Sequence, residues 1–284
     1  MTRLLACIDA STYANSVCAL TAWAAKRLDA AVELLHVIQR KDSASARNDL
    51  SGAIGLGVKS ELLEELTRID EAAGKAAIEQ GRALLNAAEK SLNEAGVSDI
   101  HQVHRHGGII DTIVEQEETA DLVVIGKRGA SSDFASEHIG SNLERVVRSS
   151  SKPVLIASRH VLEPKSAVLA YDGSPAARRA LHYVANSNLF EGLAVHVVVA
   201  GSNSPKNCDL LEEASSQLSG RKPATVTHLA DGPAEAVIAE YLGTVDDALL
   251  IMGAYGHSPF RAFIVGSTTT AMVRTVHVPV LLLR

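Results

Sequence analysis

Short apolar runs alternate with longer amphipathic stretches along the first half of the chain. The apolar runs occupy residues 3–9, 32–38, 100–103, 122–125 and 153–157. The run at 32–38 lacks the strict alternation of a half-exposed strand, which is typical of a parallel strand covered on both faces. Apolar positions after these runs recur at helical spacing. The pattern therefore predicts strands and helices in alternation.

The second half of the chain repeats this order of elements. Its apolar runs occupy residues 167–171, 195–199, 226–229, 248–252 and 278–283. Strands that alternate with helices favour parallel sheets with helices on both faces. We therefore predict an α/β fold of two five-stranded, parallel, Rossmann-like sheets, each with the strand order 3-2-1-4-5.

The two repeats are separated near residues 159–165, where Pro164 and several charged residues interrupt the apolar pattern. This break predicts one domain over residues 1–159 and a second over residues 165–284. In each predicted domain the first and fourth strands are neighbours. The crevice at their carboxyl ends is where open α/β sheets bind ligands.

The first half is longer than the second because it contains an insertion. Asp172 follows Asp9 by 163 positions, whereas Gly253 follows Gly126 by only 127. Most of the difference falls within residues 40–95. The offset between the halves is therefore not constant along the chain.

The inserted segment has the pattern of a long amphipathic helix, and we place a helical insertion near residues 40–75. Gly74 and Gly81 are expected to weaken this helix. The helix either covers its own sheet or serves as an arm that contacts another protein. Its apolar positions are Leu62, Leu66, Ile69, Ala73, Leu84, Ala88 and Leu92.

Composition narrows the class of protein. Hydrophobic residues make up 46% of the chain, which predicts buried cores, and the net charge of −6 lacks the basic excess of a nucleic-acid-binding protein. No uninterrupted apolar run approaches the ~18 residues of a membrane span, so we expect a cytoplasmic protein without a membrane partner. Cys7, Cys18 and Cys208 are widely spaced, which favours reduced thiols.

A glycine-rich loop follows the fourth apolar run of the second half. Gly253 and Gly256 come directly after the run, and Gly266, Ser267 and Thr268 open the next predicted helix. Glycines allow backbone N–H groups to approach an anion, and a helix N-terminus favours negative charge. The loop is therefore a candidate phosphate site, although a tight turn and helix capping by the hydroxyls would explain the same residues.

An acid closes the first apolar run of each half, at Asp9 and at Asp172. If the fourth strand lies beside the first, each acid faces the glycine loop of its own half. Its carboxylate could then accept hydrogen bonds from an adenine edge or a ribose hydroxyl. The alternative is an Asx turn that caps the following helix.

The acid and the loop resemble the universal stress protein family, whose nucleotide-binding members carry an Asp after the first strand and G-x2-G-x9-G-[ST] after the fourth. The second half matches this spacing, and both halves share the pattern, so the chain resembles a tandem, two-domain member. The resemblance implies ATP, with or without Mg²⁺, as the ligand. It also implies contacts to ATP from Asp172, Val198, Gly253, Gly256, Gly266, Ser267 and Thr268.

The first half departs from the family pattern. Ten residues instead of nine lie between Gly129 and Gly140, and Asp133 and Glu137 place acids in a loop that should cover phosphates. Repulsion between these acids and phosphate should weaken binding, so we expect ATP mainly in the second half. The corresponding candidate residues of the first half are Asp9, Gly126, Gly129, Gly140, Ser141 and Asn142.

Three cations and a group of histidines complete the candidate chemistry. Lys127, Arg128 and Arg261 could offset phosphate charge, or they are solvated surface residues. Strand geometry places His104 and His106 on one face and His101 on the other, which argues against a three-histidine metal site. His228 is expected to occupy the position of His104 in the second half.

Neither loop contains the lysine of a P-loop or an evident general base. Fast phosphoryl transfer is therefore not expected, and the resemblance implies an ATP-binding regulatory protein of the stress response. The alternatives are a slow ATP-hydrolysing enzyme with His257 as its acid or base, and a scaffold that has lost nucleotide binding. The resemblance further implies that the two fifth strands pair within the chain as a pseudo-dimer. A protein partner is expected but not identified, and a homodimer of chains is also consistent with the sequence.

Overall fold

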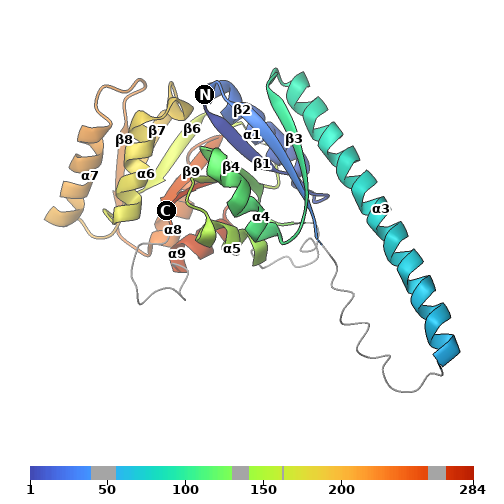
Figure 1. Ribbon diagram of the computed structural model, residues 1–284. Coiled ribbons are helices and arrows are strands. Elements are labelled where there is room, and N and C mark those ends of the chain that lie inside the picture. Colours follow the sequence, from blue (N-terminus) through green and yellow to red (C-terminus); the bar gives the residue numbers. More distant parts are fainter. Residues whose placement is uncertain (40–55, 130–140, 162, 255–266) are drawn as a thin grey trace.

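The computed structural model describes residues 1–39, 56–129, 141–161, 163–254 and 267–284, with side chains described except at 56–63, 141 and 267. The described strands form one ten-stranded sheet (Figure 1). Its strand order is β3-β2-β1-β4-β5-β10-β9-β6-β7-β8.

Each half of the chain contributes five strands and the helices that connect them. The first half contains β1 (Arg3–Cys7), α1 (Ala14–Leu28), β2 (Ala31–Ile38), α3 (Leu56–Glu94), β3 (Ile100–His106), α4 (Ile109–Gln116), β4 (Leu122–Gly126), α5 (Ser141–Ser149) and β5 (Val154–Ala157). The second half contains β6 (Ser166–Ala170), α6 (Pro175–Asn186), β7 (Ala194–Ala200), α7 (Pro205–Gln217), β8 (Val226–Ala230), α8 (Ala234–Leu242), β9 (Ala248–Gly253), α9 (Ser267–Thr275) and β10 (Val280–Leu283). Short 3₁₀ turns, η1 (Glu117–Thr119) and η3 (Asn188–Phe190), follow α4 and α6.

The predicted strand order 3-2-1-4-5 is confirmed within each half, but the two predicted sheets are in fact one. Strands β5 and β10 pair antiparallel, with Leu155 opposite Leu281, and every other pair of neighbouring strands is parallel. The expected pairing of the fifth strands is therefore confirmed. It satisfies the backbone groups of two strands that would otherwise be sheet edges.

Helices cover the continuous sheet on both faces, and two apolar cores result. Alternate residues of a strand point to opposite faces, so Leu4 and Ala6 lie in one core and Leu5 lies in the other. Helices α1, α3, α6 and α7 contribute to the first core, and α4, α5, α8 and α9 to the second (Figure 1). Both cores run through both halves, so the halves are packed as one body.

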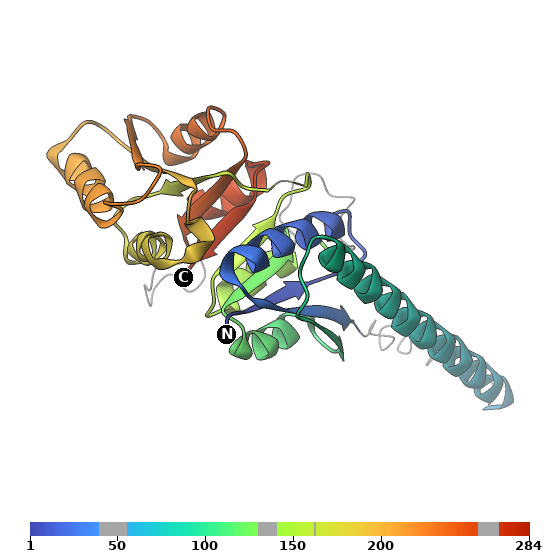
Figure 2. The ribbon, with the colours of Figure 1, turned by 90° about the horizontal axis from the view of Figure 1, so that it is seen from above.

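The inserted helix α3 contains every apolar position assigned to it from the sequence, from Leu62 to Leu92, and runs without a break through both of its glycines. Its carboxyl-terminal part packs on the first core through Leu85, Ala88 and Leu92. Its amino-terminal part extends away from the sheet (Figure 2), and the Ile69 side chain there is 55% exposed. The helix therefore covers its own sheet with one end only, so both sequence interpretations apply to parts of it.

Gly81 is the closest point of contact between α3 and the sheet. A Cβ atom at this position would lie 2.4 Å from Nε2 of His104 and 2.7 Å from Cδ2 of His36. At Gly74, by contrast, a Cβ would meet nothing within 4 Å. The two glycines thus have different roles, since only Gly81 is needed for packing.

We expect alanine at these two positions to change stability in opposite directions. Gly81→Ala should lower the free energy of unfolding by about 1–3 kcal/mol, because the histidine rings must move. Gly74→Ala should raise it by about 0.5–1 kcal/mol, because alanine favours the helix. Urea unfolding of both variants and the wild type measures the two changes. Equal effects of the two substitutions would contradict the close packing of α3 on His104.

The histidines next to α3 correct one sequence expectation. In the strand register, His36 lies opposite His104, whereas His228 lies opposite Val198. His104 faces α3, and its ring centroid is 5.4 Å from that of His36. His228 instead stacks near Tyr241 of α8, with the ring centroids 4.5 Å apart. The two histidines therefore lie on opposite faces, so the equivalence of His228 and His104 was wrong by one position.

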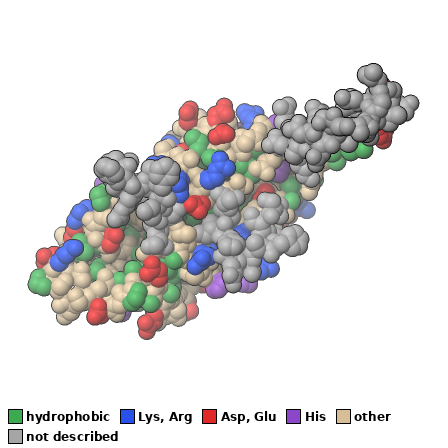
Figure 3. All heavy atoms as spheres, turned by 90° about the horizontal axis from the view of Figure 1, so that it is seen from below, with side chains coloured by type: hydrophobic (Ala, Val, Ile, Leu, Met, Phe, Trp, Pro, Cys, Tyr) green, Lys and Arg blue, Asp and Glu red, His purple; other side chains and the backbone are tan. Residues whose placement is uncertain are grey.

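The helices, the potential metal ligands and the surface charges of the described residues bear on possible partners. Among the described residues, no helix combines the length and the apolar character needed to cross a bilayer. No group of three or more His, Cys, Asp or Glu side chains in the described ranges could hold a metal ion. On the surface drawn in Figure 3, the coloured acidic and basic side chains are interspersed.

Candidate functional site

A pocket opens at the carboxyl ends of β1 and β4 in the first half, and we call it site 1. It combines Asp9, Gly126, Gly129 and Asn142, four of the residues predicted from the sequence. These residues meet because neighbouring parallel strands end at the same edge of the sheet. Its remaining lining is formed by Cys7, Ile8, Leu35, Val37, Ile109, Ile113, Ile125, Arg128 and Leu143.

The second half forms a corresponding pocket at the ends of β6 and β9, which we call site 2. Four predicted residues line it, namely Asp172, Val198, Gly253 and Thr268. The other lining residues are Ala170, Tyr171, Ala177, Ala200, Ala234, Ile238, Met252 and Thr269. The two halves thus build their pockets from equivalent elements.

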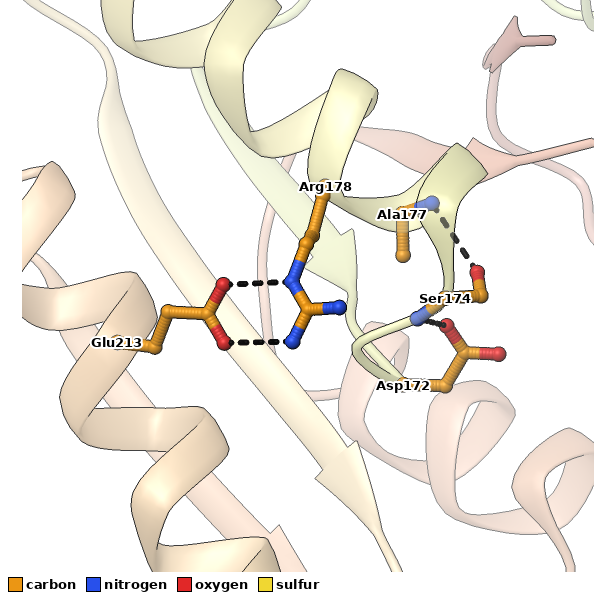
Figure 4. Close-up of polar contacts among 5 residues, drawn as sticks. All are labelled: Asp172, Ser174, Ala177, Arg178 and Glu213. Atoms are coloured by element: carbon orange, nitrogen blue, oxygen red, sulfur yellow. Dashed lines mark hydrogen bonds and ion pairs between the residues drawn. The ribbon is translucent and has the colours of Figure 1, made fainter.

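The acid of each pocket also holds the turn that follows its strand. Oδ1 of Asp9 accepts a hydrogen bond from the backbone N–H of Ser11 at 3.1 Å, and Oδ1 of Asp172 accepts one from Ser174 at 2.9 Å. Figure 4 shows the second carboxylate oxygen of Asp172 directed away from Ser174. The Asx turn expected as an alternative is therefore present in both halves, and at Asp172 it uses one carboxylate oxygen.

The start of α6 is fixed by a second set of polar contacts. Oγ of Ser174 caps the helix by accepting the backbone N–H of Ala177 at 3.2 Å. One turn further along, the Arg178 guanidinium forms a two-pronged ion pair with Glu213 of α7, with N–O distances of 2.8 and 3.1 Å (Figure 4). These contacts orient the helix against which site 2 is built.

Gly129 and Gly253 make close contacts in their pockets, but with different kinds of partner. A Cβ at Gly129 would lie 3.0 Å from Oδ2 of Asp9, so the loop after β4 contacts the acid after β1. A Cβ at Gly253 would lie 2.5 Å from the backbone nitrogen of Ala177. Gly253 is therefore required for the contact of β9 with the start of α6, a role distinct from the phosphate access predicted for it.

Several predicted residues lie outside the described structure. Ser141 and Ser267 are the first residues of α5 and α9, but only their backbone is described. The predicted site residues outside the described ranges are Gly140, Gly256 and Gly266, and the other loop residues named above that fall there are Asp133, Glu137, His257 and Arg261.

Each pocket faces the N-termini of two helices, not one. Asn142 of α5 and Ile109 of α4 line site 1, and Thr268 of α9 and Ala234 of α8 line site 2. Helix N-termini present backbone N–H groups and partial positive charge, which attract anions. The starts of α4 and α8 were not among the predicted site residues.

Charged side chains differ between the two pockets. Arg128 lines site 1 and brings a cation to it. In site 2, the Thr268 hydroxyl forms a hydrogen bond with the Glu235 carboxylate, which lowers the pKa of Glu235. An acid therefore stands at the helix N-terminus of site 2 where a phosphate was predicted, and sequence reasoning missed it.

Comparisons with known proteins give a consistent result. The model of the universal stress protein family matches residues 1–158 and 200–284. A universal stress protein of Synechocystis sp. is 32% identical over 287 positions, covering 100% of both chains. The solved structure of a universal stress protein from Archaeoglobus fulgidus superposes with a TM-score of 0.75 at 21% identity, covering 99% of this chain and 98% of its own.

Proposed function

Because this chain belongs to the universal stress protein family, we propose that it is a stress-response regulatory protein of the cytoplasm that binds ATP, with or without Mg²⁺. The observation that carries the proposal is the repeated pocket. In both halves, an acid after the first strand, a glycine after the fourth strand and a helix N-terminus surround one cavity.

The chemistry of the two pockets suits a nucleotide. Apolar side chains such as Leu35 and Val37 in site 1, and Val198 and Ile238 in site 2, provide a surface for a base. The acids supply acceptors for a base edge or a ribose hydroxyl, and the helix N-termini supply N–H donors for phosphates.

Binding is better supported than catalysis. The described lining of the two pockets includes no lysine or histidine that could stabilise a leaving phosphate or act as a general base. We therefore propose that bound nucleotide controls conformation or partner choice, with hydrolysis slow at most. Turnover that is lost in His257→Ala while ATP still binds would instead identify a slow ATPase.

We place the tighter site in the second half, where Gly253, Gly256 and Gly266 keep the spacing of the family's nucleotide-binding members. Glu235 opposes an anion at this site, since its carboxylate contacts Thr268 at the start of α9. The effect of the Glu235 charge on ATP affinity can be measured by replacing Glu235 with glutamine, which has nearly the same shape without the charge.

Glu235→Gln is expected to increase the ATP affinity of site 2 by about tenfold when Mg²⁺ is chelated, since it removes a negative charge close to the phosphates. Glu240→Gln is the matched control, because Glu240 is an exposed residue of the same helix. Isothermal titration calorimetry in EDTA measures both variants. Unchanged or weaker affinity in Glu235→Gln would place the phosphates away from Thr268.

The identity of the ligand can be tested on the protein as it is isolated. We expect mass spectrometry of the nucleotide released from purified, denatured protein to detect an adenine nucleotide, and its phosphate count will distinguish ATP from ADP and AMP. Nucleotide at a level no higher than in an unrelated protein purified in parallel, together with no uptake of added ATP, would argue for a scaffold that has lost nucleotide binding.

A further inference from the structure

Lys127 links the loop of site 1 to the second half of the molecule. It directly follows Gly126 at the end of β4, but it is not part of the lining of site 1. Its Nζ instead donates a hydrogen bond of 2.7 Å to the backbone carbonyl of Val276, the residue that follows α9. A side chain of the first half therefore holds the carboxyl end of a helix of the second half.

The other end of the same helix belongs to site 2. Thr268 and Thr269, in the first turn of α9, line that pocket. The last turn closes through a bond of 3.0 Å from the N–H of Val276 to the carbonyl of Met272, and the Met272 side chain is fully buried. A helix of nine residues is only about 13 Å long and moves as a unit. Its position at Val276 thus sets its position at Thr268.

Electrostatics explain why a cation is useful at Val276. The carboxyl end of a helix carries partial negative charge, which an ammonium group stabilises, and the opposite end attracts anions. Desolvation by partial burial, together with the neighbouring Arg128, lowers the pKa of Lys127 to about 8. Since burying a charge costs free energy, a methionine of similar length should be at least as favourable for stability. Folding stability alone therefore does not explain why a lysine stands at position 127.

The second half holds α5 by a different residue. The position equivalent to Lys127 in the second half is Ala254, which follows Gly253 and cannot donate a side-chain hydrogen bond. Instead, Nη1 of Arg284 donates a hydrogen bond to the backbone carbonyl of Arg148 in the last turn of α5. Each half thus holds the site helix of the other through a cation, and Lys127 is the cation that holds α9.

We propose that Lys127 is a positioning residue for the nucleotide site of the second half, because it holds α9 in the place where the start of that helix meets the phosphates. The proposal rests on the proposed function. Domain 1 then sets the nucleotide affinity of domain 2 without contacting the ligand. By thermodynamic linkage, nucleotide in site 2 must in turn strengthen the contact of Lys127 with Val276.

Three variants test this positioning role. Lys127→Met removes the ammonium, Lys127→Arg keeps a positive charge at all relevant pH values, and Lys165→Met is the control. Lys165 also forms an inter-residue contact, 2.6 Å from its Nζ to Oδ2 of Asp247, but it lies before β6 and away from both pockets. The measurement is the ATP affinity of site 2 at pH 7 and at pH 9. Site 2 is identified as the binding event that Asp172→Asn weakens.

In the wild type, we expect this affinity to fall between pH 7 and pH 9, because Lys127 loses its proton through pH 8 and with it the attraction to the helix end. Lys127→Met should bind about tenfold more weakly at pH 7 and show no such fall. Lys127→Arg should keep wild-type affinity at pH 7 and lose none at pH 9. Lys165→Met should behave as the wild type at both pH values.

Hydrogen exchange without nucleotide provides a second readout. Lys127→Met should speed exchange of the amides in the last turn of α9, and Lys165→Met should not. Equal ATP affinity and equal exchange in the wild type and Lys127→Met would overturn the positioning role alone. Absence of ATP binding in the wild type would overturn the proposed function as well, so the two failures are distinguishable.

Discussion

Gly253→Ala is expected to destabilise the protein more than Gly81→Ala, by about 2–4 kcal/mol in the free energy of unfolding. The added Cβ would lie 2.5 Å from the backbone nitrogen of Ala177 and 2.6 Å from the backbone carbon of Ala176. Backbone atoms cannot rotate away as a side chain does. The start of α6 must therefore move, and the cap that Ser174 provides would be lost with it.

Urea unfolding followed by circular dichroism measures this change, with Gly74→Ala as the control that adds the same methyl group in open space. A loss in Gly253→Ala below about 1 kcal/mol would contradict the close contact between β9 and α6. The result matters for function too. Since Gly253 is needed for packing, loss of nucleotide binding in a Gly253 variant would not by itself locate the site.

Asp172→Asn is expected to weaken ATP binding at site 2 by about 10–100-fold while the fold is preserved. Asparagine can still accept the N–H of Ser174 through its side-chain oxygen, so the turn before α6 remains. What is lost is the charge that strengthens a hydrogen bond to the nucleotide, which amounts to roughly 1.5–3 kcal/mol. Isothermal titration calorimetry with ATP measures the change.

Asp9→Asn is the matched variant in the first half, because Asp9 holds the equivalent turn through Ser11. It should weaken only the site 1 binding event and leave the tighter event unchanged. Loss of the tighter event in Asp9→Asn, with Asp172→Asn unaffected, would reverse the proposed ranking of the two sites. Unfolding curves that match the wild type confirm that both variants fold.

The order of the strands and the location of the pockets could be predicted from the repeat in the sequence. The apolar runs gave the ten strands, and the acids and glycines after them share one edge of the sheet because parallel strands end together. The offset of 163 positions between Asp9 and Asp172 also relates Leu35 to the predicted residue Val198, and both line their pockets. Leu35 could therefore have been found from the sequence by the same step.

Contacts between distant elements could not be predicted in the same way. Gly253 matches the phosphate-loop pattern, but its packing against Ala177 depends on how closely α6 approaches β9. The reach of Lys127 to Val276 crosses from one half to the other and has no periodic signal. The contact of Glu235 with Thr268 joins two helix starts that follow different strands. Each of these depends on tertiary geometry alone.

Local patterns also left one role undetected and led to one specific error. Gly74 and Gly81 lie in α3 as predicted, but the sequence did not show that packing on the sheet requires a glycine at position 81. The histidine comparison failed because a shift of one residue in a strand changes the face on which a side chain lies. His104 accordingly contacts α3, whereas His228 contacts Tyr241 on the other side.

Equilibrium dialysis with labelled ATP tests the central claim most directly, namely that the crevices at the ends of β1 and β6 hold an adenine nucleotide. We predict saturable binding to the wild type, a tighter event that is about 10–100-fold weaker in Asp172→Asn, and weakening of both events in the double variant Asp9→Asn with Asp172→Asn. Absence of binding to the wild type at millimolar ATP, or full binding by the folded double variant, would contradict the account.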